Sequence, residues 1–111
     1  MAKPDHDQVW ALFQDAVNMR ADEIEDWLAG EESRKVGFTR PGESESVGRQ
    51  SGRRIVAILR TPRAELGGGD YAHMRKVVGY VARHRVQGPA RNPESSRWRY
   101  SLMNWGHDPC A

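Results

Sequence analysis

The sequence predicts an all-α fold: a single small domain of about five helices with one long loop rich in glycine and serine. Its 111 residues suit one domain with one hydrophobic core. Apolar residues recur at helical spacing in several segments, which glycine and proline separate, and we find no clear strand pattern. Hydrophobic residues make up 38% and charged residues 29% of the chain, which is typical of a folded domain.

The first 32 residues are expected to form an acidic helical hairpin. Apolar side chains in residues 5–18 lie on one broad stripe at helical period, so this segment should be a helix that packs on the core. The stripe contains Val9, Trp10, Leu12, Phe13, Ala16 and Val17. A second helix is expected over residues 20–29, with Gly30 just past its end as a stop.

Residues 37–52 break the helical period with Pro41, four glycines and three serines, and we expect a loop or an irregular arm there. Loops of this length in a compact domain are often functional or disordered. The segment is therefore a candidate binding element.

Residues 53–109 are expected to form a basic helical part. An apolar run at residues 55–59 predicts a short helix with Ser51 as its N-cap, although the run is also compatible with a strand. Three successive glycines, residues 67–69, predict a flexible break.

Two more helices are expected after these glycines. The longest should run over residues 71–85, with Asp70 as its cap and valines at steps of three and four. A last helix is expected over residues 95–105, where Trp98, Leu102 and Trp105 share one face. Together, residues 1–111 are predicted to form a single helical domain.

Charge is divided unevenly along the chain. Residues 1–32 carry two basic and nine acidic side chains, so their net charge is −7, whereas residues 33–111 carry fifteen basic and six acidic side chains, a net charge of +9. Such an asymmetry indicates one region that attracts anions and one acidic region, although charges of this kind can also simply solvate helix faces.

Several function classes find no support in the sequence. The single cysteine, Cys110, allows no intramolecular disulfide and no thiolate metal cluster, and no apolar run is long enough to span a bilayer. The histidines lack metal-ligand spacing, and no nucleophile elbow is present. We expect a cytoplasmic protein with no enzyme activity, cofactor, metal ion or membrane contact. A catalytic site assembled in space from Asp70, His73 and His107 stays open as an alternative.

Four segments carry a family resemblance. They are Glu-Ser-Val-Gly at 45–48, Ser-Gly-Arg-Arg-Ile-Val at 51–56, Asp-Tyr-Ala-His-Met-Arg-Lys-Val-Val-Gly-Tyr-Val at 70–81, and Trp-Arg-Tyr-Ser-Leu-Met-Asn-Trp-Gly-His-Asp-Pro at 98–109. With them the chain resembles DUF3140, an uncharacterised family of small bacterial and fungal proteins, from the helix containing Trp27 to Pro109. Some members carry a DNA-binding label, so the resemblance implies nucleic acid as a ligand. It implies no reaction, cofactor or catalytic residue.

The favoured function is sequence-nonspecific binding of nucleic acid, with DNA as the expected partner, through Arg and Lys contacts to phosphate. Residues 48–54 suit a phosphate if a glycine turn there leads into a helix start, because free backbone N–H groups would lie beside guanidinium groups. The basic side chains of residues 71–85 supply a second patch. The expected nucleic-acid-binding residues are Arg49, Ser51, Gly52, Arg53, Arg54, Arg75, Lys76, Arg83 and Arg85. A DNA-binding protein of this kind would associate with the nucleoid.

The alternative is a protein-binding adaptor or homo-oligomeric module with no nucleic-acid role. In that case the acidic N-terminal helices or residues 37–52 would engage a partner protein or a second copy of the chain. The cations near the end of the 71–85 helix would then only stabilise its C-terminus.

Overall fold

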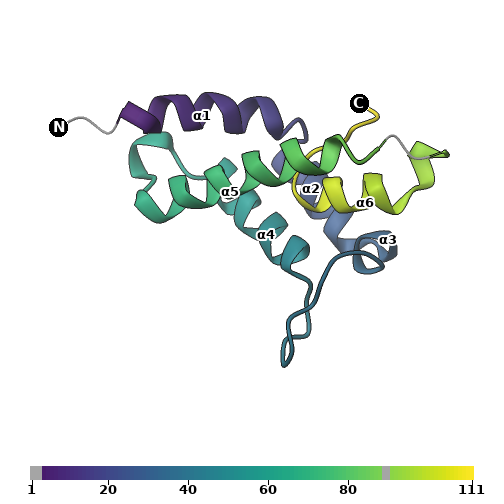
Figure 1. Ribbon diagram of the computed structural model, residues 1–111. Helices are drawn as coiled ribbons and strands as arrows, with labels where there is room; N and C mark the ends of the chain where they lie inside the picture. Colours follow the sequence, from purple (N-terminus) through teal and green to yellow (C-terminus); the bar gives the residue numbers. More distant parts are fainter. Residues whose placement is uncertain (1–3, 89–90) are drawn as a thin grey trace.

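The computed structural model describes residues 4–88 and 91–111, and within them the fold is all-α with no strand, as predicted (Figure 1). The helices are α1 (Pro4–Ala16), α2 (Ala21–Ala29), α3 (Glu31–Arg34), α4 (Val47–Leu59), α5 (Gly68–Arg85) and α6 (Arg97–Asn104), with 3-10 turns η1 (Arg63–Glu65) and η2 (Pro93–Ser95). No helix in the described part of the chain is long and apolar enough to cross a membrane.

Helix α5 is the longest helix, and α1 lies alongside it (Figure 1). Helix α2 packs on α4, while α6 contacts α2, α3, α4 and α5. The two acidic helices thus pack mainly on the basic part of the chain rather than on each other. Side chains from all four longer helices and from α6 form one core, in which the largest fully buried apolar residues are Phe13, Ile24, Ile55, Ile58, Met74, Leu102 and Val77.

Helix α4 begins earlier than the sequence predicts. Its N-cap is Ser46, whose Oγ accepts a hydrogen bond from the Arg49 N–H at 3.2 Å, so the prediction of Ser51 as N-cap is wrong. The irregular segment before α4 accordingly ends at Ser46, and the last six residues of the predicted 37–52 loop are helical.

Two glycines inside α4 explain this difference. A Cβ at Gly52 would lie 2.6 Å from the Asn104 backbone oxygen, and one at Gly48 would lie 3.1 Å from Trp105 Nε1. The glycines therefore let α6 approach α4 closely. Their weak helix propensity is outweighed by this packing, which the chain pattern does not reveal.

Helix α5 also begins earlier, because Gly68 and Gly69 form its first turn rather than a flexible break. The Asp70 carboxylate accepts a hydrogen bond at 2.9 Å from the N–H of Gly67, the residue before the helix, so Asp70 is not the N-cap. The last helix begins at Arg97 with Ser96 as its cap. The short elements α3, η1 and η2 were not predicted.

Candidate functional site

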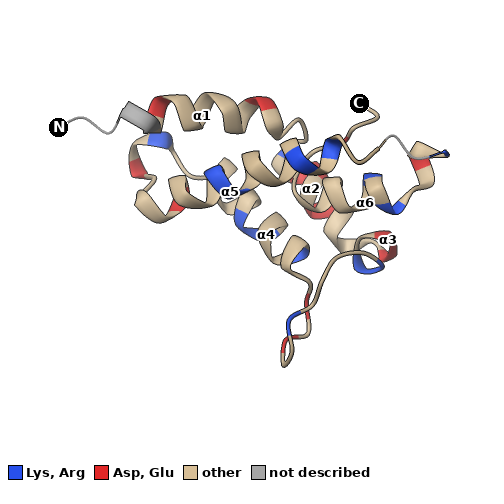
Figure 2. Cartoon of the chain, viewed as in Figure 1, with Lys and Arg blue, Asp and Glu red and all other residues tan. Residues whose placement is uncertain are grey.

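Red bands lie on α1 and α2 and blue bands on α4, α5 and α6, while α3 and the loop before α4 carry both colours (Figure 2). Some of these charges are already paired. Arg60 donates from both Nη atoms to the Glu25 carboxylate at 2.7 Å, and Arg63 binds Asp7. The hydrogen bond from Arg60 lowers the pKa of Glu25. These two arginines bind the acidic helices to the basic part of the chain.

Arg49 lies in the interior, where only 5% of its surface is exposed. Its Nη1 donates to the Leu28 carbonyl at 2.6 Å and to Ser33 Oγ at 2.7 Å, and its Nη2 lies 3.1 Å from a Glu45 carboxylate oxygen. Ser33 Oγ in turn donates to Asn104 Oδ1 at 2.5 Å. The guanidinium thus links α2, α3, α4 and α6, and its donors are used inside the protein.

Ser51 and Gly52 also face the interior. Ser51 Oγ lies 2.9 Å from His73 Nε2, and this contact joins α4 to α5. Burial, together with the nearby charges of Arg54 and Lys76, lowers the pKa of His73 to about 4, so the ring is neutral at pH 7. The predicted glycine turn at residues 48–54 is wrong, because this segment lies inside α4 and its backbone N–H groups serve the helix.

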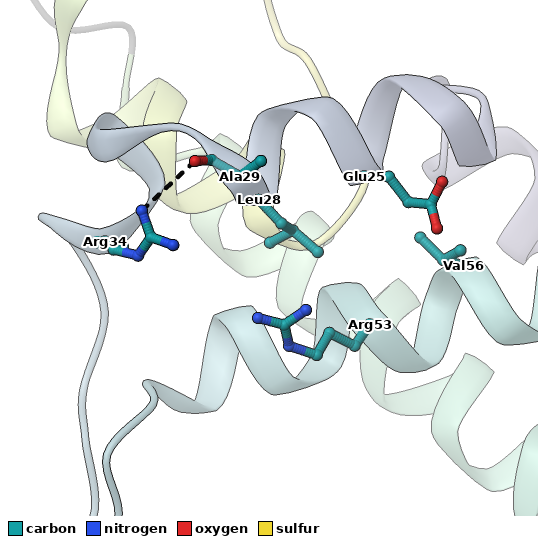
Figure 3. Close-up of a pocket in the computed structure, with 6 residues that line it drawn as sticks. All are labelled: Glu25, Leu28, Ala29, Arg34, Arg53 and Val56. Atoms are coloured by element: carbon teal, nitrogen blue, oxygen red, sulfur yellow. Dashed lines mark hydrogen bonds between the residues drawn. The ribbon is translucent and has the colours of Figure 1, made fainter.

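Arg53 points into a pocket of about 490 Å3 between α2 and α4 (Figure 3). Arg34 reaches the same pocket from α3, and its Nη1 donates to the Ala29 carbonyl at 3.4 Å. The pocket is lined by Glu25, Leu28, Ala29, Arg34, Arg53 and Val56. Arg53 is held by Glu45, which its Nη2 contacts at 2.6 Å, and this hydrogen bond lowers the pKa of Glu45. The pocket offers guanidinium groups to an anion but also contains the Glu25 carboxylate.

Helix α5 presents the most uniform basic surface. Among its 18 residues, the exposed ones are Gly68, Gly69, Ala72, Arg75, Lys76, Ala82, Arg83 and Arg85. Four of them are cations and none is acidic. Within the described part of the chain, Lys76, Arg83 and Arg85 form no ion pair, and Arg54 of α4 lies nearby, 3.4 Å from the half-buried Asp70.

These cations do not all lie on one side. Lys76 and Arg83 are two helical turns apart, so they differ in direction by only about 20°. Arg85 points about 180° away from Lys76 and lines a different hollow beside Trp98 and His107. The nine predicted residues thus do not form one surface. Arg49, Ser51 and Gly52 lie in the interior, and Arg53 lines the α2–α4 pocket. Lys76 and Arg83 share one side of α5, Arg54 lies near the start of that helix, and Arg85 lies apart.

Four stacked rings lie between α5 and α6. The Tyr80 ring lies 4.3 Å from Trp105 and 5.1 Å from His84, and Trp105 also stacks on His73 at 6.3 Å. Burial lowers the pKa of His84 and raises the pKa of Tyr80. These contacts hold the Tyr80 ring in place, and Tyr80 lies between Lys76 and Arg83 along α5.

The alternative catalytic grouping of Asp70, His73 and His107 is only partly assembled. The charge of Asp70 acts on His73, but His107 Nδ1 lies 2.7 Å from the Ala16 carbonyl at the end of α1. No hydrogen bond among the described residues links His107 to the other two.

Sequence reasoning missed the polar network around Asn104 of α6. Asn104 Oδ1 also accepts a hydrogen bond from Trp27 Nε1 at 2.8 Å. No signal at Ser33 or Asn104 predicts their meeting, since the two residues are 71 positions apart. The segments at 45–48 and 98–109 meet around this network, so many of their residues serve packing.

Comparison with known proteins gives one result. The family model described as "Protein of unknown function (DUF3140)" matches residues 12–103. No curated protein and no solved structure matches the chain.

Proposed function

Since the chain belongs to the DUF3140 family, which is described as of unknown function, we propose a function from its own side chains: sequence-nonspecific binding of nucleic acid. The landing surface is the side of α5 that carries Lys76 and Arg83, with Arg54 of α4 beside Asp70 near the start of this helix. The observation that carries the proposal is that Lys76 and Arg83 lie on the same side of α5, a helix about 27 Å long whose exposed residues include no carboxylate.

Phosphate is the anion that this surface suits best. Duplex DNA carries one negative charge per about 1.7 Å of its axis, so a row of cations on a helix can meet several phosphates at once. Ala72 lies one turn before Lys76 on nearly the same side of the helix, and its small side chain leaves room for a backbone to approach. Arg54 can exchange its exposed ion pair with Asp70 for a phosphate at little cost, because such pairs contribute about 0–1 kcal/mol.

The same helix favours contact without sequence readout. Adenine is typically recognised by Asn or Gln in the major groove, and α5 contains neither residue. We assign its cations to the phosphate backbone, contacts that hold a nucleic acid but do not distinguish sequences. With DNA as its partner, the protein acts in the cytoplasm at the nucleoid.

A second candidate is a protein-binding module that uses the acidic N-terminal helices. Leu12 is 47% exposed on α1 and lies three residues before Asp15, which is also exposed. An exposed large apolar side chain beside carboxylates suits a basic, partly apolar protein partner or a second copy of the chain.

The test is the salt dependence of binding to a random DNA duplex, measured by fluorescence anisotropy between about 50 and 200 mM salt. The test variant, Lys76→Ala with Arg83→Ala, should bind with a log–log salt slope that is less steep by about 1.8, since each phosphate contact contributes about 0.9.

The matched control is Arg20→Ala with Arg40→Ala, which removes two exposed cations from other parts of the surface. It should leave the slope near that of the unmodified protein. No binding by the unmodified protein at about 50 mM salt, or equal slopes for the test and control variants, would overturn the proposal.

A further inference from the structure

A small pocket of about 310 Å3 lies where the loop before α4 meets α5 and α6. This volume is at the lower end of the range for ligand sites, about 300–1,000 Å3, so the pocket has room for one small group. Its walls are mostly carbon. Phe38 of the loop, Tyr80 of α5 and Trp105, just past the end of α6, supply them.

Phe38 is an exposed ring on a fixed backbone. Its side chain is 68% exposed, whereas its carbonyl accepts a hydrogen bond from the Val47 N–H at 2.8 Å. The preceding residue, Gly37, has a φ of +97°, and a Cβ there would lie 3.0 Å from Ser46 Oγ. The loop thus has a backbone that only glycine adopts easily, and it holds an aromatic surface in water beside the pocket.

Hydroxyl groups lie at the polar edge of the pocket. Ser101 lines it from α6, and its hydrogen bond with Tyr80 acts on the phenol. The Tyr80 ring already stacks on Trp105 and on His84, whereas Phe38 is exposed, so Phe38 is the lining ring that is open to a ligand.

Cations lie within about one helical turn of two residues that line the pocket, Tyr80 and Ser101, and no carboxylate lines it. Lys76 and Arg83 lie four residues before and three residues after Tyr80, on the same side of α5. On the other side, Arg97 lies one turn before Ser101 on α6, and its Nη1 donates to the Lys35 carbonyl at 2.8 Å. The pocket therefore adjoins the basic face to which we assign phosphate contact.

We propose that this pocket receives one unpaired base of single-stranded nucleic acid, which stacks on Phe38 while the flanking phosphates contact Lys76, Arg83 and Arg97. The proposal rests on the proposed function and adds a preference for single strands. A planar apolar base with polar edges fits an aromatic slot with hydroxyls, and its phosphates fit the cations beside it. A duplex keeps its bases paired and stacked and cannot insert one without cost.

The experiment compares two labelled probes of about 12 nucleotides, an oligothymidylate strand and a random duplex, by fluorescence anisotropy at one salt concentration. Phe38→Ala should weaken binding of the single strand by about 5- to 150-fold, the loss that follows from removing one stacked base. It should leave binding of the duplex unchanged. Phe38→Trp should keep the affinity for the single strand, and the control Leu12→Ala, which trims an exposed apolar side chain on α1, should alter neither.

The outcomes separate the two proposals. If Phe38→Ala binds the single strand as the unmodified protein does, or loses both probes equally, the base pocket is overturned while salt-dependent duplex binding still supports the proposed function. If the unmodified protein binds neither probe, both proposals fail. If a polyglutamate peptide of equal charge displaces the strand equally well from the unmodified protein and from Phe38→Ala, the pocket is not a base site.

Discussion

Arg49 and Arg53 lie one turn apart on α4 and both contact the carboxylate of Glu45, yet their surroundings differ sharply. The Arg49 side chain is 6% exposed and donates to two further groups in the interior, whereas the Arg53 side chain is 57% exposed and borders an open pocket. One arginine belongs to the core and the other to the surface.

Replacing each arginine by methionine should separate these roles. We expect Arg49→Met to lower the free energy of unfolding by about 2–3 kcal/mol, because Leu28 O and Ser33 Oγ lose a charged hydrogen-bond partner in the interior. Arg53→Met should change it by less than about 1 kcal/mol, as is usual for an exposed ion pair. Urea unfolding followed by circular dichroism measures both values, and equal losses in the two variants would contradict the assignment.

Helix α4, which carries both arginines, shows how far the sequence could predict the structure. The helical stripes of α1, α2, α5 and α6 follow directly from apolar spacing, and with them the all-α fold. The start of α4 did not follow, because both Ser46 and Ser51 suit an N-cap. Only the packing of Gly48 and Gly52 against α6 decides between them.

The candidate site was predictable in part. Charge counting found the basic half of the chain, and helical geometry alone places Lys76 and Arg83 on one side of α5. The interior position of Arg49 depends on Ser33 and Asn104, which are distant in sequence, so no local pattern reveals it. The exposed Phe38 was missed for a similar reason, since loop residues have no period from which exposure can be predicted.

Acidification should destabilise the protein through His73. Its pKa is about 4 in the folded protein and about 6.5 when the chain is unfolded, so only the unfolded chain binds this proton between these values. The stability that comes from the neutral ring is therefore complete above pH 6.5 and is lost as the pH falls toward 4. The loss is below about 1.4 kcal/mol per pH unit, since solvent screens a partly exposed ring.

Thermal unfolding at several pH values between 7 and 4 checks this dependence on His73. The control His73→Gln keeps a side chain that can hydrogen-bond to Ser51 but cannot titrate, so its stability should fall less over the same range. Some dependence should persist, because burial also lowers the pKa of His84. An identical pH profile for the variant and the unmodified protein would show that His73 does not carry the effect.

Two glycine substitutions should shift stability in opposite directions. In Gly52→Ala the new Cβ would lie 2.6 Å from the Asn104 backbone oxygen, so α4 and α6 must separate and the free energy of unfolding should fall by about 1–3 kcal/mol. In Gly68→Ala the new methyl group meets nothing within 4 Å in the first turn of α5, where alanine restricts the unfolded chain and should stabilise by about 0.4–1 kcal/mol. Urea midpoints at equal m-values measure both shifts. A stable Gly52→Ala variant would mean that α4 and α6 do not meet as closely as the structure shows.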